Sequence, residues 1–370
     1  MTTAVSDPSP ATNARKPAGA EFNTLRVSGV EQLCDDAVAV TFAVPDTLAD
    51  NYAFRPGQTL VLRRTVDGVE HRRSYSICNP VGAAPRVGVR EVPGGLFSEW
   101  LVREVAAGDE IDVATPSGSF VADPTEAGHH LLVAAGSGIT PVLSIAASVL
   151  ANPDSRVTLV YGNRNTGSVM FAEEIADLKD AHHERLSIMH LLSREPRDVE
   201  MFTGRVDTDH MTAILDDLIR ADQVEHAWLC GPLEMVEQVR GTLISHGMPA
   251  ERVHRELFFV DGPPPAPRPR TSIVGDGAAT SEVTVVLDGK ATTAALPQDE
   301  TILDAAERIR ADLPFACKGG VCGTCRAKVT CGEVDMRRNY ALEDSEVADG
   351  FVLTCQAFPV SDTVTVDFDA

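Results

Sequence analysis

Residues 317–325 read Cys-Lys-Gly-Gly-Val-Cys-Gly-Thr-Cys, and a further cysteine, Cys355, follows later in this chain of 370 residues. Three cysteines so close together can direct their thiolates toward one point if the backbone curls tightly. The three glycines of the segment permit such a curl, with backbone N–H groups directed at sulfur. The segment therefore predicts a metal centre. Its expected ligands are Cys317, Cys322, Cys325 and Cys355.

The spacing Cys-x4-Cys-x2-Cys with one distant cysteine resembles that of plant-type ferredoxins, which bind a [2Fe-2S] cluster. A zinc site is the alternative, because two cysteines two positions apart can also bind zinc. Cys331 competes with Cys355 as the fourth ligand, but it closely follows Cys325 on an expected strand that leaves the loop. We expect Cys331 to be a buried spare thiol.

Sequence texture divides the rest of the chain into blocks of different kinds, as its length leads one to expect. Short alternating stretches separated by Pro and Gly turns predict an antiparallel β-barrel in the first part. From Leu131, apolar strands alternate with helices, which predicts a doubly wound parallel α/β sheet. The expected divisions are a disordered tail at 1–20, the barrel at 21–124, the α/β domain at 125–261, a Pro-rich linker at 262–281 and a ferredoxin domain at 282–370.

The last block shows the pattern of an α+β domain. A hairpin is expected from Val283 to about Leu296, turning at Asp288-Gly289, and a helix is expected over 301–310. Strands are expected at 351–354 and 364–368. With the cysteine spacing, this order resembles the β-grasp fold of ferredoxins.

Composition excludes several function classes. The net charge of -22 opposes binding to nucleic acid or to an anionic membrane surface. No apolar run is long enough to span a bilayer, and the first twenty residues lack the apolar segment of a secretion signal. The eight cysteines are better explained as reduced thiols or metal ligands than as disulfides, so we expect a cytoplasmic protein.

Two motifs on the expected barrel favour a flavin. The stretch Arg73-Ser-Tyr75-Ser76 resembles the Arg-x-Tyr-Ser motif of the ferredoxin–NADP reductase superfamily, in which the arginine pairs with the flavin pyrophosphate and the serine lies near flavin N5. Residues 92–98 resemble its Gly-rich phosphate loop. Alone, the first motif could consist of surface residues and the second could be a plain turn. Expected flavin contacts are Arg73, Tyr75, Ser76, Gly94, Gly95 and Ser98. The domain order favours FAD over FMN.

A third motif follows the first apolar strand of the α/β block. Residues 136–141, Gly-Ser-Gly-Ile-Thr-Pro, lie at an expected strand–turn–helix junction, where the pyrophosphate of a dinucleotide binds. Ending the motif in proline suits the first turn of a helix. Expected nucleotide contacts are Gly136, Gly138, Thr140 and Pro141.

Two positions near the end of the α/β block complete the resemblance. Cys230-Gly231 ends the fourth expected strand, and Cys230 matches a cysteine that lies near the reacting nicotinamide carbon in the superfamily. Glu256 matches the terminal glutamate near the flavin, and Cys230, Gly231 and Phe258 are expected cofactor contacts. Without the resemblance, Cys230 would be a packing thiol and Glu256 a surface carboxylate. We assign catalytic roles to Ser76, Cys230 and Glu256.

The choice of nicotinamide cofactor depends on the residues after the second and third strands. NAD enzymes usually place an acid there for the ribose hydroxyls, whereas a 2′-phosphate calls for arginine and hydroxyl groups. Arg164 follows the second strand without an acid beside it, and Ser193-Arg194 ends the third. These residues favour NADPH over NADH.

The three cofactors predict an electron path from NADPH to FAD, to the [2Fe-2S] cluster and then to a partner protein. The whole chain resembles the reductase components of ring 1,2-phenylacetyl-CoA epoxidases, which implies the oxygenase subunits of such an epoxidase as partner. The acidic ferredoxin block, with sixteen Asp or Glu against eight Lys or Arg, would suit a basic oxygenase surface. Alternatives are the reductase of a Rieske-type steroid 9α-hydroxylase and a non-catalytic redox-sensing or electron-carrier module.

Overall fold

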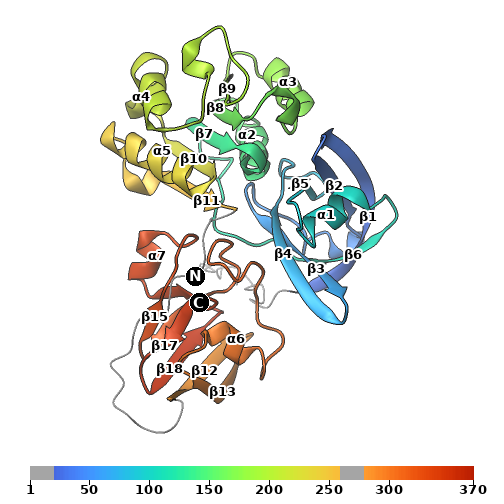
Figure 1. Ribbon diagram of the computed structural model, residues 1–370, viewed down its shortest axis with the longest axis vertical. Coiled ribbons are helices and arrows are strands. Elements are labelled where there is room, and N and C mark those ends of the chain that lie inside the picture. The colour runs from blue at the N-terminus through green and yellow to red at the C-terminus, as the bar shows by residue number, and fades with distance from the viewer. Residues whose placement is uncertain (1–20, 259–278) are drawn as a thin grey trace, which may run out of the picture.

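A computed structural model describes residues 21–258 and 279–370 and contains three blocks in chain order. Figure 1 shows the first in blue, the second mainly in green and yellow, and the third in orange and red. The expected tail at 1–20 and most of the expected linker at 262–281 lie outside the described residues. Strand β12 begins at Thr280, within the range expected for the linker.

The first block is a six-stranded antiparallel sheet that closes into a barrel, as predicted. Its strands are β1 (Phe22–Cys34), β2 (Ala37–Ala43), β3 (Thr59–Val66), β4 (Val69–Ser76), β5 (Arg86–Arg90) and β6 (Glu110–Ala114), in the spatial order β4-β3-β6-β1-β2-β5. A bridge between Ile77 and Val87 joins the two outer strands. Alternate side chains fill the barrel interior, and the short helix α1 (Ser98–Arg103) covers one side.

The second block is the predicted doubly wound sheet, with all neighbouring strands parallel. Its strands are β7 (His129–Ala135), β8 (Arg156–Asn163), β9 (Leu186–Leu192), β10 (His226–Gly231) and β11 (Val253–Leu257), in the order β11-β10-β7-β8-β9. Its helices are α2 (Ile139–Val149), α3 (Ala172–Ala181), α4 (Thr208–Asp217) and α5 (Leu233–Ser245). Apolar clusters lie on both faces of the sheet, which explains why the central strands are almost wholly apolar. None of the helices in the described residues could span a membrane.

The third block is the predicted α+β domain. A five-stranded mixed sheet has the order β13-β12-β18-β14-β16, and β15 pairs with β17 beside it. The elements are β12 (Thr280–Leu287), β13 (Lys290–Pro297), α6 (Ile302–Ala306), β14 (Arg326–Cys331), β15 (Val334–Met336), α7 (Asp344–Ala348), β16 (Phe351–Leu353), β17 (Ala357–Pro359) and β18 (Thr363–Asp367). Asp288 and Gly289 both have positive φ, as the predicted two-residue hairpin turn requires.

Two expectations for this block were wrong. The helix expected over 301–310 ends at Ala306, because the chain tightens into a turn in which the Ile309 amide bonds to the Ala306 carbonyl. The guanidinium of Arg310 reaches back instead to the carbonyl oxygen of Leu287. Cys331 is exposed rather than buried, because it is the last residue of β14 and lies beyond the apolar core.

The three blocks pack against one another. Ala37 and Ala39 of β2 belong to the apolar cluster under the α/β sheet, which joins barrel and sheet in one core. The third block contacts the barrel through Ala316, which packs with Val61 and Ala114. These contacts bring residues far apart in sequence to the site described next.

Candidate functional site

The three expected catalytic residues lie together where the barrel meets the α/β sheet. Cys230 and Glu256 are opposite each other in the parallel pair β10 and β11. The hydroxyl of Ser76, at the end of β4, donates a hydrogen bond of 3.0 Å to Oε2 of Glu256. Two domains therefore contribute to one cluster of polar groups.

Burial changes the protonation of this cluster. Glu256 is partly covered, but its carboxyl group faces buried Ser76, and burial raises its pKa to about 8 while the Ser76 hydrogen bond opposes the rise. Burial, together with the nearby Glu256 carboxylate, raises the pKa of Cys230 well above its usual range. This site thus offers the carboxyl group of Glu256, which can hold a proton at neutral pH, and the thiol of Cys230, which stays protonated.

The expected flavin strand presents Arg73 and Tyr75 on β4. The Arg73 side chain is exposed, and its Nη1 donates 2.7 Å to the carbonyl oxygen of Arg72. Tyr75 packs against the barrel core, and burial raises its pKa. An exposed guanidinium beside a packed tyrosine ring fits the pyrophosphate and the ring system of a flavin.

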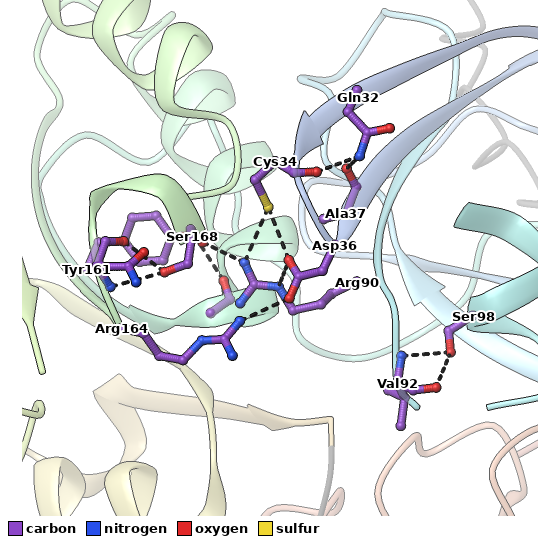
Figure 2. Close-up of polar contacts among 12 residues, drawn as sticks. Gln32, Cys34, Asp36, Ala37, Arg90, Val92, Ser98, Tyr161, Arg164 and Ser168 are labelled. Carbon is purple, nitrogen blue, oxygen red and sulfur yellow. Dashed lines mark hydrogen bonds and ion pairs between the residues drawn. The ribbon is translucent and has the colours of Figure 1, made fainter. Parts of the chain in front are cut away.

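The Gly-rich loop before α1 is shaped by its own side chains. The Ser98 hydroxyl accepts a hydrogen bond of 3.0 Å from the Val92 amide, as Figure 2 shows. A side chain at Gly95 would come within 2.5 Å of Ser98 Oγ, so glycine is required there. The Gly94 amide donates 2.7 Å to the Glu99 carboxylate, so this amide already faces an anionic group.

A cleft of about 820 Å³ opens at the carboxyl ends of the parallel strands, where open α/β sheets bind ligands. Its walls include most of the residues expected to bind the nucleotide: Gly136, Gly138, Arg164, Ser193, Arg194, Gly231 and Phe258. A side chain at position 138 would lie 2.2 Å from the carbonyl oxygen of Cys230. The turn can therefore approach β10 this closely only because residue 138 is glycine. Thr140 and Pro141 are instead buried in the first turn of α2.

Sequence reasoning missed part of this cleft. Arg90, Arg205, Asp207 and Gln238 also line it. Arg90 comes from the barrel, and an isolated arginine on a barrel strand carries no signal of its own. Arg205 lies in a loop that follows β9, and only the fold places it in the same cleft as Arg194.

An ion-pair network joins the barrel to the rim of this cleft, as Figure 2 shows. Arg164 Nη2 lies 3.0 Å from Oδ2 of Asp36, and Arg90 Nε lies 3.3 Å from Oδ1 of the same carboxylate. The thiol of Cys34 donates 3.2 Å to Asp36 as well. Arg164, an expected cofactor ligand, is therefore already paired with an acid from the other domain.

The four expected cluster ligands form two close pairs. The neighbouring Cys322 thiol lowers the pKa of Cys317, and the Cys325 thiol lowers the pKa of Cys355 in the same way. The Gly319 amide donates 3.3 Å to Cys317 Sγ, and Gly320 and Gly323 have positive φ. Among the described residues no three His, Cys, Asp or Glu side chains already surround one metal position. Two pairs of cysteines nevertheless fit a cluster of two irons, each needing two protein ligands.

Comparison with known families agrees with this geometry. Family models for an oxidoreductase FAD-binding domain, an oxidoreductase NAD-binding domain and a 2Fe-2S iron-sulfur cluster binding domain match residues 24–121, 132–241 and 285–360. The chain is also 42% identical over 354 residues to one of the subunits of 1,2-phenylacetyl-CoA epoxidase from Escherichia coli (strain K12), covering 94% of this chain and 98% of that protein. The chain belongs to the ferredoxin reductase family. This reductase is an electron-transfer oxidoreductase that uses FAD, NAD(P)H and a [2Fe-2S] cluster.

Further relatives of this reductase are components of other oxygenases. It is 35% identical over 363 residues to the ferredoxin reductase component of 3-ketosteroid-9-alpha-monooxygenase from Rhodococcus rhodochrous, covering 96% of this chain and all of that protein. Among solved structures, phthalate dioxygenase reductase matches 94% of this chain and 98% of its own with a TM-score of 0.56 at 22% identity. That structure shows a shared fold.

Proposed function

We propose that this reductase takes electrons from NADPH and delivers them to the oxygenase component of a phenylacetyl-CoA epoxidase. The observation that carries this proposal is the 42% identity to a component of such an epoxidase over 98% of that protein's length, against 35% for the steroid monooxygenase relative. We further propose a cytoplasmic location, where its free cysteines would stay reduced.

In this proposal residues 21–124 hold FAD, residues 125–261 hold NADPH and residues 282–370 carry the cluster. When bound, FAD would accept one hydride, which carries two electrons, and release these electrons singly, whereas a [2Fe-2S] cluster carries one electron at a time. The chain itself supplies binding, orientation and proton control. The ligands of the cluster would be Cys317, Cys322, Cys325 and Cys355.

The side chains of Ser76, Cys230 and Glu256 would orient the reacting groups. Ser76 ends the flavin strand β4, and its hydroxyl donates a hydrogen bond to Glu256 Oε2. Glu256 can hold a proton near neutral pH and exchange it with the Ser76 hydroxyl across this hydrogen bond. Cys230, buried and neutral, would pack beside the nicotinamide at the carboxyl end of β10.

The preference for NADPH is supported by positive charge in the cleft. Ser193 and Arg194 are exposed there, and Arg205 lies on the same wall. A hydroxyl and two guanidinium groups can bind a 2′-phosphate, whereas the ribose hydroxyls of NADH offer them no charge.

The partner can be tested with the purified holoprotein. NADPH consumption and epoxide formation are measured with phenylacetyl-CoA epoxidase oxygenase subunits, with and without phenylacetyl-CoA. We expect consumption that depends on the acyl-CoA and matches the epoxide formed. If the reductase oxidises NADPH with an artificial acceptor but forms no epoxide with these oxygenase subunits, the epoxidase assignment is overturned. The same assay with a steroid 9α-hydroxylase oxygenase would then test the other relative.

A further inference from the structure

Arg72, on the flavin strand β4, is a barrel residue whose surroundings are completed by the ferredoxin block. Its side chain is only 6% exposed. Nη1 donates 3.2 Å to the carbonyl oxygen of Leu313, and the guanidinium lies 4.1 Å from the ring centre of Phe315. Leu313 and Phe315 directly precede the cluster loop. One arginine of the barrel therefore holds the segment that leads to the cluster.

Within the barrel, Arg72 has its own partners. Nη2 lies 2.7 Å from Glu70, and the guanidinium stands 5.1 Å from the ring of Phe22. Arginine stays charged at all ordinary pH values, so a covered guanidinium must be paired. Glu70 provides that pairing from within the barrel itself, on the same strand as Arg72. The contacts that Arg72 makes with the ferredoxin block are therefore additional to its ion pair in the barrel.

The Phe315 ring contacts two cations. Arg72 lies on its ring at 4.1 Å, and the ammonium group of Lys318 lies 4.7 Å from the same ring centre. Such contacts strengthen when water is excluded. The next residue, Ala316, is buried against Val61 and Ala114 of the barrel, with Cys322 packed beside them. The surface of the ferredoxin block that packs on the barrel therefore includes Cys322, an expected ligand of the iron–sulfur cluster.

The same strand also carries the flavin-facing serine. Arg72 and Ser76 are four residues apart on one face of β4, which corresponds to roughly 13 Å along an extended strand. Both are buried, and Arg73 between them is exposed. Because electron tunnelling weakens exponentially with distance, the point at which the cluster segment is anchored on this strand would set how far the cluster lies from the flavin.

We propose that Arg72 is a positioning residue that docks the cluster loop on the flavin strand and so sets the rate of electron transfer from flavin to cluster. This inference rests on the electron path proposed above but not on the identity of the oxygenase. Arg72 touches neither cofactor in this role and acts through Leu313 and Phe315.

The test uses the holoprotein alone, without an oxygenase, in rapid-mixing experiments with NADPH. Flavin bleaching and cluster reduction are followed as separate steps, and the cluster is also examined by EPR. For Arg72→Gln we expect an unchanged rate of flavin reduction, an unchanged EPR spectrum and cluster reduction slowed about tenfold, because only the docked fraction of molecules transfers electrons. Small-angle X-ray scattering should show a larger radius of gyration.

Arg63→Gln is the matched control. Arg63 pairs with Arg72 across strands β3 and β4 and lies 4.3 Å from the same Phe22 ring, but its ion pairs are with Glu70 and Asp112 of the barrel. This variant should keep the rate of cluster reduction and the radius of gyration of the unmodified protein.

A change on the other side of the contact protects the test against misfolding. Phe315→Leu leaves the barrel intact and should reproduce both the slow cluster reduction and the larger radius of gyration. Cluster reduction at the normal rate in Arg72→Gln or in Phe315→Leu would overturn the proposal, as would an equal slowing in Arg63→Gln. A lack of flavin reduction in the unmodified protein would contradict the electron path itself, so the two failures are distinguishable.

Discussion

Replacing Glu256 with glutamine should remove a pH dependence of stability that this carboxyl group creates. Burial raises the pKa of Glu256 from its ordinary value of 4.5 to about 8, and Ser76 only partly opposes this rise. Between these pKa values the folded protein retains a proton that the unfolded chain has released. The contribution is therefore fully present below about pH 4.5 and is lost as the pH rises to about 8.

The magnitude follows from the pKa rise. At about 1.36 kcal/mol for each pH unit, the whole rise corresponds to at most about 5 kcal/mol. Solvent still reaches part of the side chain, so we expect the folded protein to lose about 1–2 kcal/mol between about pH 6 and pH 8 through this group. Glutamine is neutral throughout, so Glu256→Gln should escape that loss.

Urea unfolding of the holoprotein at the two pH values, followed by circular dichroism, measures this difference. Glu256→Gln should gain about 1–2 kcal/mol relative to the unmodified protein on going from the lower to the higher pH. Glu251→Gln, at an exposed position of the same block, is the control and should show no such gain. Parallel pH profiles for Glu256→Gln and the unmodified protein would refute the reasoning. A protonated-carboxyl infrared band that titrates near pH 8 and disappears in Glu256→Gln would support it independently.

Three further predictions concern the cofactor sites. Gly138→Ala should weaken NADPH binding and destabilise the protein by about 2–3 kcal/mol, because the new methyl group would meet a backbone carbonyl at 2.2 Å; calorimetry and thermal unfolding measure the two effects. Arg194→Gln should raise the KM for NADPH about tenfold and leave the KM for NADH nearly unchanged, and steady-state kinetics with equal losses for both cofactors would contradict the 2′-phosphate assignment. Cys322→Ser should remove the visible absorbance and EPR signal of the cluster while the flavin remains, whereas Cys331→Ser, at an exposed position outside the loop, should keep both.

Local motifs made much of this protein predictable. The cysteine spacing, the hairpin turn at Asp288-Gly289 and the strand–turn–helix motif at 136–141 each constrain only a few neighbouring residues, so their geometry can be read from the chain itself. The barrel and the doubly wound sheet followed from changes in periodicity, and the ferredoxin domain from its resemblance in cysteine spacing to plant-type ferredoxins. The assignments of individual site residues remain predictions, although the structure brings Ser76, Cys230 and Glu256 together.

Errors arose where a pattern depended on its surroundings. The apolar and charged residues at 301–310 favour a helix throughout, but the chain tightens into a turn after Ala306, and the Arg310 side chain bonds to the neighbouring hairpin. Cysteine is usually buried, which favoured a buried Cys331, yet this residue lies at the end of its strand.

The sequence by itself determined which blocks form and which cofactor chemistry each can support, because periodicity, glycine turns and cysteine spacing act over short stretches of chain. Only the tertiary structure decided how the blocks meet. The pairing of Arg164 with Asp36, the raised pKa of Glu256 and the docking of Phe315 on Arg72 each join residues from different parts of the chain. Such contacts depend on the packing of whole domains, which buries charges and moves pKa values in ways that no local pattern encodes.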